Sequence, residues 1–187
     1  MKVFSVLASA GTTHVKLLSG LLAIAGVSVL TFWWTSDRAY SPEVVAERNN
    51  LVKLVPALEG AYKAKGFASL SVSAAVGDKL VPASMLRSQG SLIQSSWGTD
   101  VDLRPHSVRT PADGFSVIYQ KVPGRECQSF AMAMGAQVYD LKINGQSIMG
   151  VDAPEPSLVQ AQCAGDQGAP MEFVFHSDLI PGTAVLR

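Results

Sequence analysis

The sequence predicts an α+β protein in which a long N-terminal helix packs on an antiparallel β-sheet. An apolar run covers residues 17–34, and an amphipathic helical pattern follows over about 42–65. Segment 115–119 is rich in aromatic and β-branched residues, and segment 172–176 alternates between apolar and polar residues. Both patterns are typical of strands. Because a helix with one apolar face must bury that face, these elements favour helix-on-sheet packing.

The apolar run is long enough to cross a membrane. It spans about eighteen residues without a charge, which as a helix cover about 27 Å of the ~30 Å hydrocarbon core. The alternatives are a cleaved secretory signal, whose apolar core is usually about 7–15 residues, and a buried soluble helix. The residues expected in the membrane are Leu17, Leu18, Leu21, Leu22, Ile24, Val27, Val29, Leu30, Phe32, Trp33 and Trp34.

The charges before the run predict its orientation. Lys2 and Lys16 are the charged side chains there, and positive charge stays on the cytoplasmic side of a membrane helix. The chain after the run is therefore expected outside the cytoplasm. The expected divisions are a leader or short cytoplasmic tail (1–16), a transmembrane helix (17–34), an amphipathic helix (35–66) and an α+β head domain (67–187).

The amphipathic helix has clear start and stop signals. Ser41 suits the N-cap, Pro42 suits the first turn, and Gly66 suits the position after the helix. Pro56 lies inside the pattern and is expected to bend or break the helix locally. The apolar face is made of Val44, Leu51, Val55, Leu58 and Tyr62. Three charged residues are expected off this face: Glu47, Lys53 and Lys65.

The first part of the head alternates weak and strong signals. Residues 67–78 are rich in Ser, Ala and Gly and predict a connecting loop, whereas a short helix is expected from Pro82 to about Gln89. Segment 99–104 alternates like a strand and should pair with 115–119 across the intervening turn.

The second part contains a strong hairpin signal. Asn144-Gly145 favours a two-residue turn between strands 137–143 and 146–151. A short helix is expected over 126–134, before this hairpin. Residues 152–170 collect prolines and glycines and predict a long irregular loop.

Cys127 and Cys163 are the two cysteines of the chain, and both follow the expected membrane segment. An oxidising compartment would let them pair. A loop of about 37 residues closed in this way would stabilise the fold by roughly 4 kcal/mol at most. Free or metal-ligating thiols are the alternative, but no cysteine or histidine spacing typical of a zinc site occurs.

Charge and motifs argue against several functions. The formal net charge is +0 and the pI is about 6.8, so direct nucleic-acid binding is not expected. The three histidines, His14, His106 and His176, lie in no known catalytic or metal motif. The triplet His176-Ser177-Asp178 contains triad residue types, but chain neighbours cannot form a relay. The sequence therefore predicts no enzyme, no catalytic residue, no cofactor and no metal.

An ordered set of segments resembles the type IVb pilins, and among them the PilS-type group of conjugative thin pili. The likeness covers about Asn49 to Asp178. It rests on Trp97-Gly98, Phe115-Ser116-Val117-Ile118-Tyr119, Val122-Pro123, Cys127, Lys142-Ile143-Asn144-Gly145, Cys163 and Glu172-Phe173-Val174-Phe175, together with the N-terminal helix.

The resemblance implies a type IV pilin-like fold and a filament subunit. Such a subunit waits in the inner membrane with a periplasmic domain, and the pilus assembly machinery then inserts it into a helical filament of its own copies on the cell surface. The helix 17–34 would form the filament core, and the region from Cys127 to Cys163 would be the variable, exposed part of the head. Conjugation, cell adhesion, DNA uptake or secretion is the process that such a fimbria would serve.

The N-terminus departs from the family pattern. The family's leader ends in Gly, and a glutamate stands at the fifth mature position. Cleavage between Gly11 and Thr12 would place Lys16 there, which inverts the charge, and cleavage after Gly20 would place Ala25 there and shorten the apolar run. A minor pilin and a non-polymerising, membrane-anchored binding module of the envelope are therefore alternatives to a major subunit.

Overall fold

The structure is a computed structural model, which describes residues 40–87, 92–151, 153–165 and 167–176. They contain an α+β domain with a six-stranded antiparallel sheet of order β1-β2-β3-β6-β4-β5. The predicted fold class is thus confirmed. The strands are β1 (Ile93–Gln94), β2 (Asp100–His106), β3 (Gly114–Val122), β4 (Asp140–Ile143), β5 (Gln146–Ser147) and β6 (Ala169–His176).

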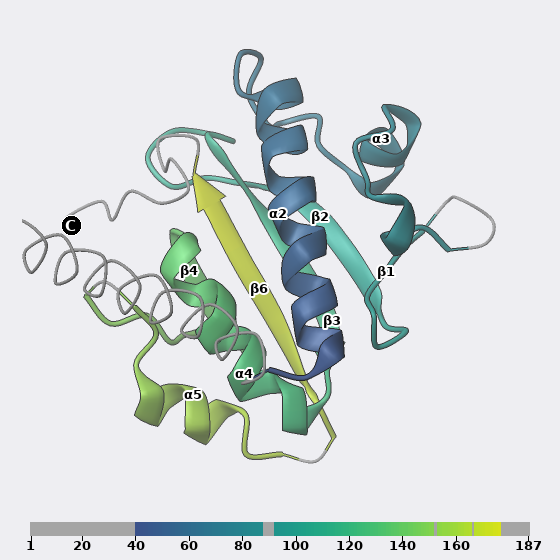
Figure 1. Cartoon of the computed structure of the whole chain (residues 1–187). Coiled ribbons are helices and arrows are strands. Elements are labelled where there is room, and N and C mark those ends of the chain that lie inside the picture. The colour runs from purple at the N-terminus through teal and green to yellow at the C-terminus, as the bar shows by residue number, and fades with distance from the viewer. Residues whose placement is uncertain (1–39, 88–91, 152, 166, 177–187) are drawn as a thin grey trace, which may run out of the picture. The chain divides into compact units, whose positions relative to one another are not determined.

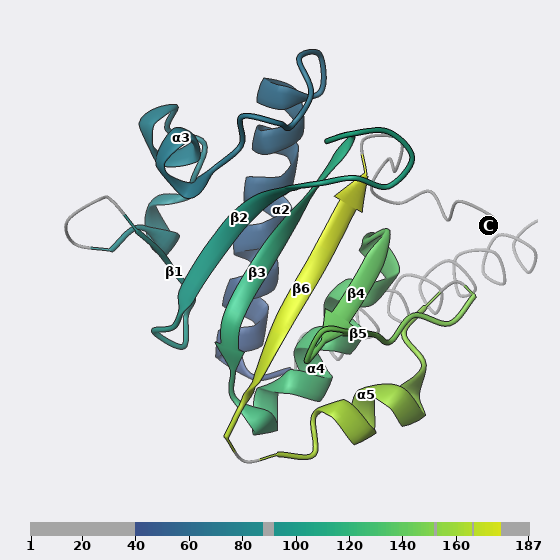
Figure 2. The same cartoon turned by 180° about the vertical axis from the view of Figure 1, so that it is seen from behind.

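Two helices, α2 (Pro42–Tyr62) and α4 (Gly124–Met134), lie on the same face of the sheet (Figure 1). Seen from behind, the strands β2, β3, β6 and β4 lie in front of these helices, and no described helix covers them on that side (Figure 2). The sheet therefore has one helix-covered face and one open face.

The core lies between the sheet and the two helices. Alternate residues of β3 and β6 point into it and are almost fully buried, and Phe130 of α4 stacks edge-on against Tyr119 and Phe173, with ring centroids 5.1 and 4.9 Å away. The buried side chains of these two strands are Phe115, Val117, Tyr119, Met171, Phe173 and Phe175. The strands predicted at 115–119 and 172–176 are thus confirmed, although Ser116, Val174 and His176 on the other face are buried as well.

Helix α2 confirms most of the predicted amphipathic helix. The Ser41 hydroxyl caps it by accepting a hydrogen bond from the Val44 N–H at 3.3 Å, and Gly66 has the positive φ of 77° expected after a helix. The helix ends at Tyr62 rather than 65 and continues through Pro56 without a break. Pro56 is exposed, so the Val52 carbonyl, which lacks its usual donor, can be hydrated.

Two segments in the first part of the head differ from the sequence expectation. Residues 67–78 contain a short helix, α3 (Val72–Gly77), because the Ser71 hydroxyl caps the Ala74 N–H at 3.1 Å. The helix expected from Pro82 is only a 3-10 turn, η2 (Ala83–Met85), since Leu86 is already extended and pairs with Ile93.

The prediction of an irregular loop over 152–170 was also wrong in part. It contains a helix, α5 (Pro156–Gln162), with proline in its first turn and Cys163 at its C-cap, and the first residues of β6. The hairpin at Asn144-Gly145 is confirmed, but its strands are shorter than predicted. A 3-10 turn, η3 (Gly135–Gln137), replaces the start of the first strand.

Within the described part of the chain, no helix combines the length and the apolar character needed to cross a membrane. The predicted transmembrane segment 17–34 lies outside the described residues.

Candidate functional site

The junction between α2 and the head is the first candidate site. Its centre is Glu47, which is fully buried although the sequence placed it off the apolar face. Its position follows from helical spacing, because residue 47 lies between Val44 and Leu51 on the stripe that faces the sheet. The assumption that a charged residue stays on the outside was wrong here.

Neutral donors surround the Glu47 carboxylate. One oxygen accepts a hydrogen bond from the Tyr119 hydroxyl at 2.8 Å. The other accepts from the Ser96 N–H at 2.8 Å, the Ser96 hydroxyl at 2.7 Å and the Asn50 amide at 3.3 Å. Burial is the main reason why the pKa of Tyr119 lies well above its ordinary value, and the negative charge of the adjacent Glu47 raises this pKa further. These bonds join α2 to β3 and to the turn between β1 and β2.

The network extends to a second segment. The Asn50 side chain also accepts a hydrogen bond from the Ser84 hydroxyl at 2.6 Å, so the η2 turn is attached to the same stretch of α2. A carboxylate with several short hydrogen bonds is a directional contact, unlike the apolar packing around it. The network therefore sets the position of α2 along its own axis.

The start of α2 is held by α4. The Ser41 hydroxyl, which caps α2, donates a hydrogen bond to Glu126 at 2.6 Å, and the Arg125 guanidinium lies 3.2 Å from the same carboxylate. This contact attaches the first turn of α2 to α4.

The disulfide predicted from the sequence is present between Cys127 of α4 and Cys163 after α5, with Cα atoms 5.6 Å apart. The segment that it closes includes β4, which pairs with β6 inside the sheet. A side chain at Gly135 would collide with the ring of Pro154, so the end of α4 packs closely on this segment. The bond thus holds part of the sheet as well as a surface region.

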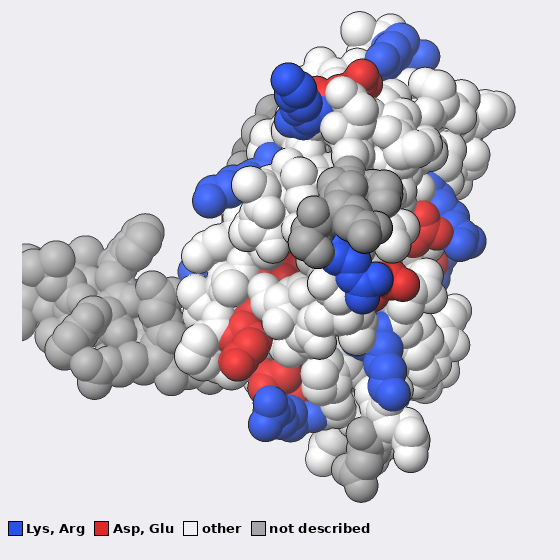
Figure 3. All heavy atoms as spheres, turned by 90° about the vertical axis from the view of Figure 1, so that its right-hand side faces the viewer, with Lys and Arg blue, Asp and Glu red and all other residues white. Residues whose placement is uncertain are grey.

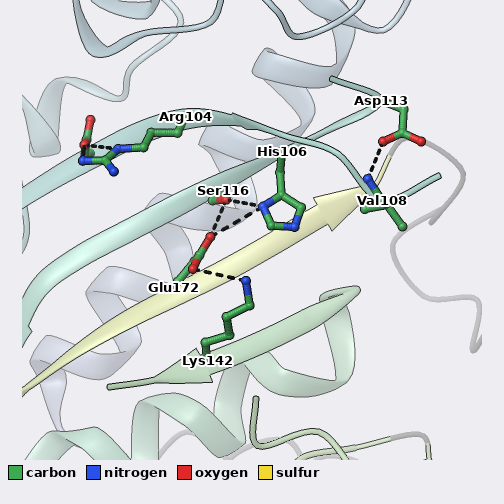
Figure 4. Close-up of polar contacts among 8 residues, drawn as sticks. Arg104, His106, Val108, Asp113, Ser116, Lys142 and Glu172 are labelled. Atoms are coloured by element: carbon green, nitrogen blue, oxygen red, sulfur yellow. Dashed lines mark hydrogen bonds and ion pairs between the residues drawn. The ribbon is translucent and has the colours of Figure 1, made fainter. Parts of the chain in front are cut away.

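The open face of the sheet carries a polar cluster of Ser116, Glu172, His106 and Lys142, one residue from each of four strands (Figure 4). Glu172 accepts a hydrogen bond from Ser116 at 2.7 Å and lies 3.5 Å from the Lys142 amine. The His106 Nδ1 lies 3.2 Å from the Ser116 hydroxyl and 3.7 Å from Glu172.

This cluster contains the residue types of a hydrolytic triad in a different arrangement. In a triad the carboxylate holds the far ring nitrogen of the histidine, and the histidine takes the serine proton. Here the Ser116 hydroxyl donates directly to Glu172, and Glu172 approaches the same His106 nitrogen as Ser116 does. Ser116 is also almost fully buried. The geometry cross-links strands and does not activate a nucleophile.

A further carboxylate, Asp113, shapes the turn between β2 and β3. It accepts hydrogen bonds from the N–H groups of Val108, Arg109 and Thr110 at 2.7, 2.9 and 2.7 Å, and His176 lies 3.3 Å away. Burial acts to raise the pKa of Asp113, but these donors together lower it well below its ordinary value. His176 therefore joins the end of β6 to this turn, while Ser177 and Asp178 lie outside the described residues.

Charge on the surface is mixed. In Figure 3, lysines and arginines alternate with acidic residues over the face shown, as the net charge of +0 suggests. The sequence-based prediction that the protein does not bind nucleic acid directly stays a prediction. The predicted cleavage residues Gly11 and Thr12 and all the predicted membrane residues between Leu17 and Trp34 lie outside the described part of the chain.

Comparisons with known proteins agree on the fold. A type IVb pilin from Salmonella typhi matches with a TM-score of 0.53 and 19% identity, over 70% of this chain and 98% of that one. TcpA, a type IV pilin from the Vibrio cholerae El Tor biotype, matches with a TM-score of 0.50 and 14% identity, over 72% and 99% of the two chains. No curated protein is significantly similar in sequence.

The family follows from sequence. The model of the PilS N-terminal family matches residues 41–175, a range that begins at the cap of α2 and ends one residue before β6 does. It therefore includes the Glu47 junction, the disulfide and the polar cluster. The chain belongs to the PilS family and is a PilS-type type IV pilin, a structural subunit of a pilus and not an enzyme.

Proposed function

We propose that this pilin is held in the inner membrane by its segment 17–34, with the head in the periplasm, and then joins a type IVb-like filament through the same segment. The observation that carries this proposal is the attachment of α2 to the head at both Ser41 and Glu47. A helix that leads into a filament core must carry its head with it. Two polar contacts to different elements of the head meet that requirement better than apolar packing, which permits sliding.

The proposed partners follow from this role. Copies of the chain would pack through the apolar segment, since a uniformly apolar helix is stable both in lipid and against other apolar helices. The assembly machinery of the pilus would transfer each subunit from the inner membrane to the cell-surface filament. Conjugation or adhesion would be the process served by the filament.

The N-terminal sequence favours a second candidate, a minor pilin or a non-polymerising envelope module on a permanent anchor. Lys16 occupies the fifth position after a cut at Gly11, and a positive charge there cannot pair with the amine of a neighbouring subunit. This candidate predicts a protein that stays in the membrane fraction.

The mass of the N-terminal peptide separates the two candidates. It is measured on protein from native envelopes and from filaments sheared off the cell surface. A start at Thr12 in the sheared fraction supports processing and assembly. An intact Met1 found only in envelopes contradicts assembly and supports the permanent anchor.

A charge in the apolar segment tests its role directly. Leu21→Lys and Ile24→Lys are expected to abolish recovery in the sheared fraction, because a lysine at the middle of a membrane helix costs about 2.5–3.5 kcal/mol. Ser5→Lys adds the same charge outside the run and is the matched control. Normal filaments from the Leu21 and Ile24 variants would exclude the proposed core.

A further inference from the structure

An apolar groove lies between α2 and α4, beside the end of β6. It has a volume of about 130 Å³ and is lined by Leu51, Val52, Val55 and Pro56 of α2, Met134 of α4, Gln137 of η3 and Phe175 of β6. Its floor is buried, but Val52 at its rim is 53% exposed. None of these lining residues is charged, so the groove suits an apolar occupant.

The chain that follows β6 has matching chemistry. Residues 177–187 read Ser-Asp-Leu-Ile-Pro-Gly-Thr-Ala-Val-Leu-Arg, with no charged side chain from Leu179 to Leu186. They begin two positions after Phe175, which itself lines the groove. Leu179 is three residues from His176, so extended chain brings it within about 10 Å of the end of β6.

We propose that one or two apolar side chains of the segment from Leu179 to Leu186 fill the groove of their own chain and that the segment covers Val52. Because the segment is tethered to one wall of the groove, its local concentration there is in the millimolar range or above. Pro181-Gly182 favours a turn, which would let the apolar residues on both sides of it return to the groove. Neither surface has a charge to desolvate, so apolar burial is unopposed by that cost.

This occupant is favoured over a second copy because it is already attached. A second copy of the chain would lose translational and rotational freedom on binding. The groove holds only one or two side chains, so it offers little apolar burial to offset that cost. The inference does not depend on polymerisation, so it can fail while the proposed function stands.

Paired cysteines in the full-length protein in detergent test the proposal. Val52→Cys is combined in turn with Leu179→Cys and with Leu186→Cys, and oxidation is followed at low protein concentration. The matched control replaces Val52→Cys with Ser73→Cys, an exposed position of α3, which lies on the other side of α2 (Figure 1). At least one Val52 pair should close within the monomer about tenfold faster than its control, because a docked segment holds the two thiols together.

Equal rates for the Val52 and Ser73 pairs would overturn the proposal, as would the absence of any crosslink. Disulfide-linked dimers through Val52→Cys would overturn it in favour of a second copy in the groove. A peptide map that retains the bond between Cys127 and Cys163 verifies that each variant has folded, so each outcome is decisive.

Discussion

Glu47 and Glu172 make similar contacts on opposite sides of the sheet, and the difference between them shows what each side is for. Both accept a hydrogen bond from a hydroxyl of β3, namely Tyr119 and Ser116. Glu47 is fully buried under α2 and is bound by neutral donors from the described chain. The Glu172 side chain is 24% exposed and faces Lys142 and His106.

Because of these two environments, we expect the two carboxylates to contribute differently to the free energy of unfolding. Water can approach the Glu172 side chain, which is 24% exposed, whereas Glu47 and its partners Tyr119 and Asn50 are buried. The covered side of the sheet therefore holds α2 in one position, whereas the open side has a tolerant polar surface.

The largest expected effect is that of Glu47→Ala. It leaves the Tyr119 hydroxyl and the Asn50 amide, which are both buried, without this acceptor, and each such group costs about 1–3 kcal/mol. We expect the free energy of unfolding to fall by about 3–5 kcal/mol, measured by urea titration. Glu47→Gln keeps one acceptor and should lose less. Glu43→Ala in the first turn of α2 is the matched control, and a similar loss in that variant would contradict the role of Glu47.

Removal of the disulfide should have the next largest effect. Cys127→Ser combined with Cys163→Ser is expected to lower the free energy of unfolding by about 2–4 kcal/mol, because the unfolded chain regains the freedom of the closed loop. Hydrogen exchange should accelerate in β4, which supplies Lys142 to the open face, more than in α2. Uniform acceleration over both elements would mean that the two sides of the sheet unfold as one unit.

Asp113 adds a pH dependence. Its folded pKa lies below the ordinary value of 3.8, so its contribution to stability is fully present above that value and is lost as the pH falls below it. Acid titration of thermal unfolding should show this loss in the wild type and a smaller loss in Asp113→Asn. Identical profiles for the two proteins would indicate that the turn is not held by this carboxylate.

The smallest effect is expected for Glu172→Gln. A partly exposed ion pair contributes about 0–1 kcal/mol, and glutamine still accepts the Ser116 hydrogen bond. Urea titration should therefore give a midpoint close to that of the wild type. Lys142→Met removes the other charge and serves as the control. A loss as large as that of Glu47→Ala would show that the two carboxylates are equivalent and would break the comparison.

Local signals in the sequence predicted the elements that local chemistry sets. Ser41 and Pro42 start α2, and Asn144-Gly145 turns the hairpin. Aromatic and β-branched residues mark β3, and alternation marks β6. The short helix α5 was missed, because the sequence around it is dominated by proline and glycine, and its position depends on the disulfide at its C-cap. Helix α3 rests on a single serine cap, which is a weak signal among many serines.

The candidate site was less predictable than the fold. The two cysteines could be paired from the sequence because no other cysteine competes for them. The burial of Glu47 could have been suspected from its spacing, since it lies on the apolar stripe of α2. Its partners could not, because Tyr119 lies 72 positions away and Ser96 lies 49 positions away.

By itself, the sequence determined the fold class, the family resemblance, the disulfide, the start of the main helix and the presence of the central strands. These depend on caps, turn residues and apolar periodicity, whose physical causes act over a few residues. The tertiary structure alone decided that β4 lies beside β6, that Glu47 is a buried acceptor, and that Ser116, His106, Glu172 and Lys142 meet on the open face. Strand order brings those side chains together, and it depends on how the whole core packs.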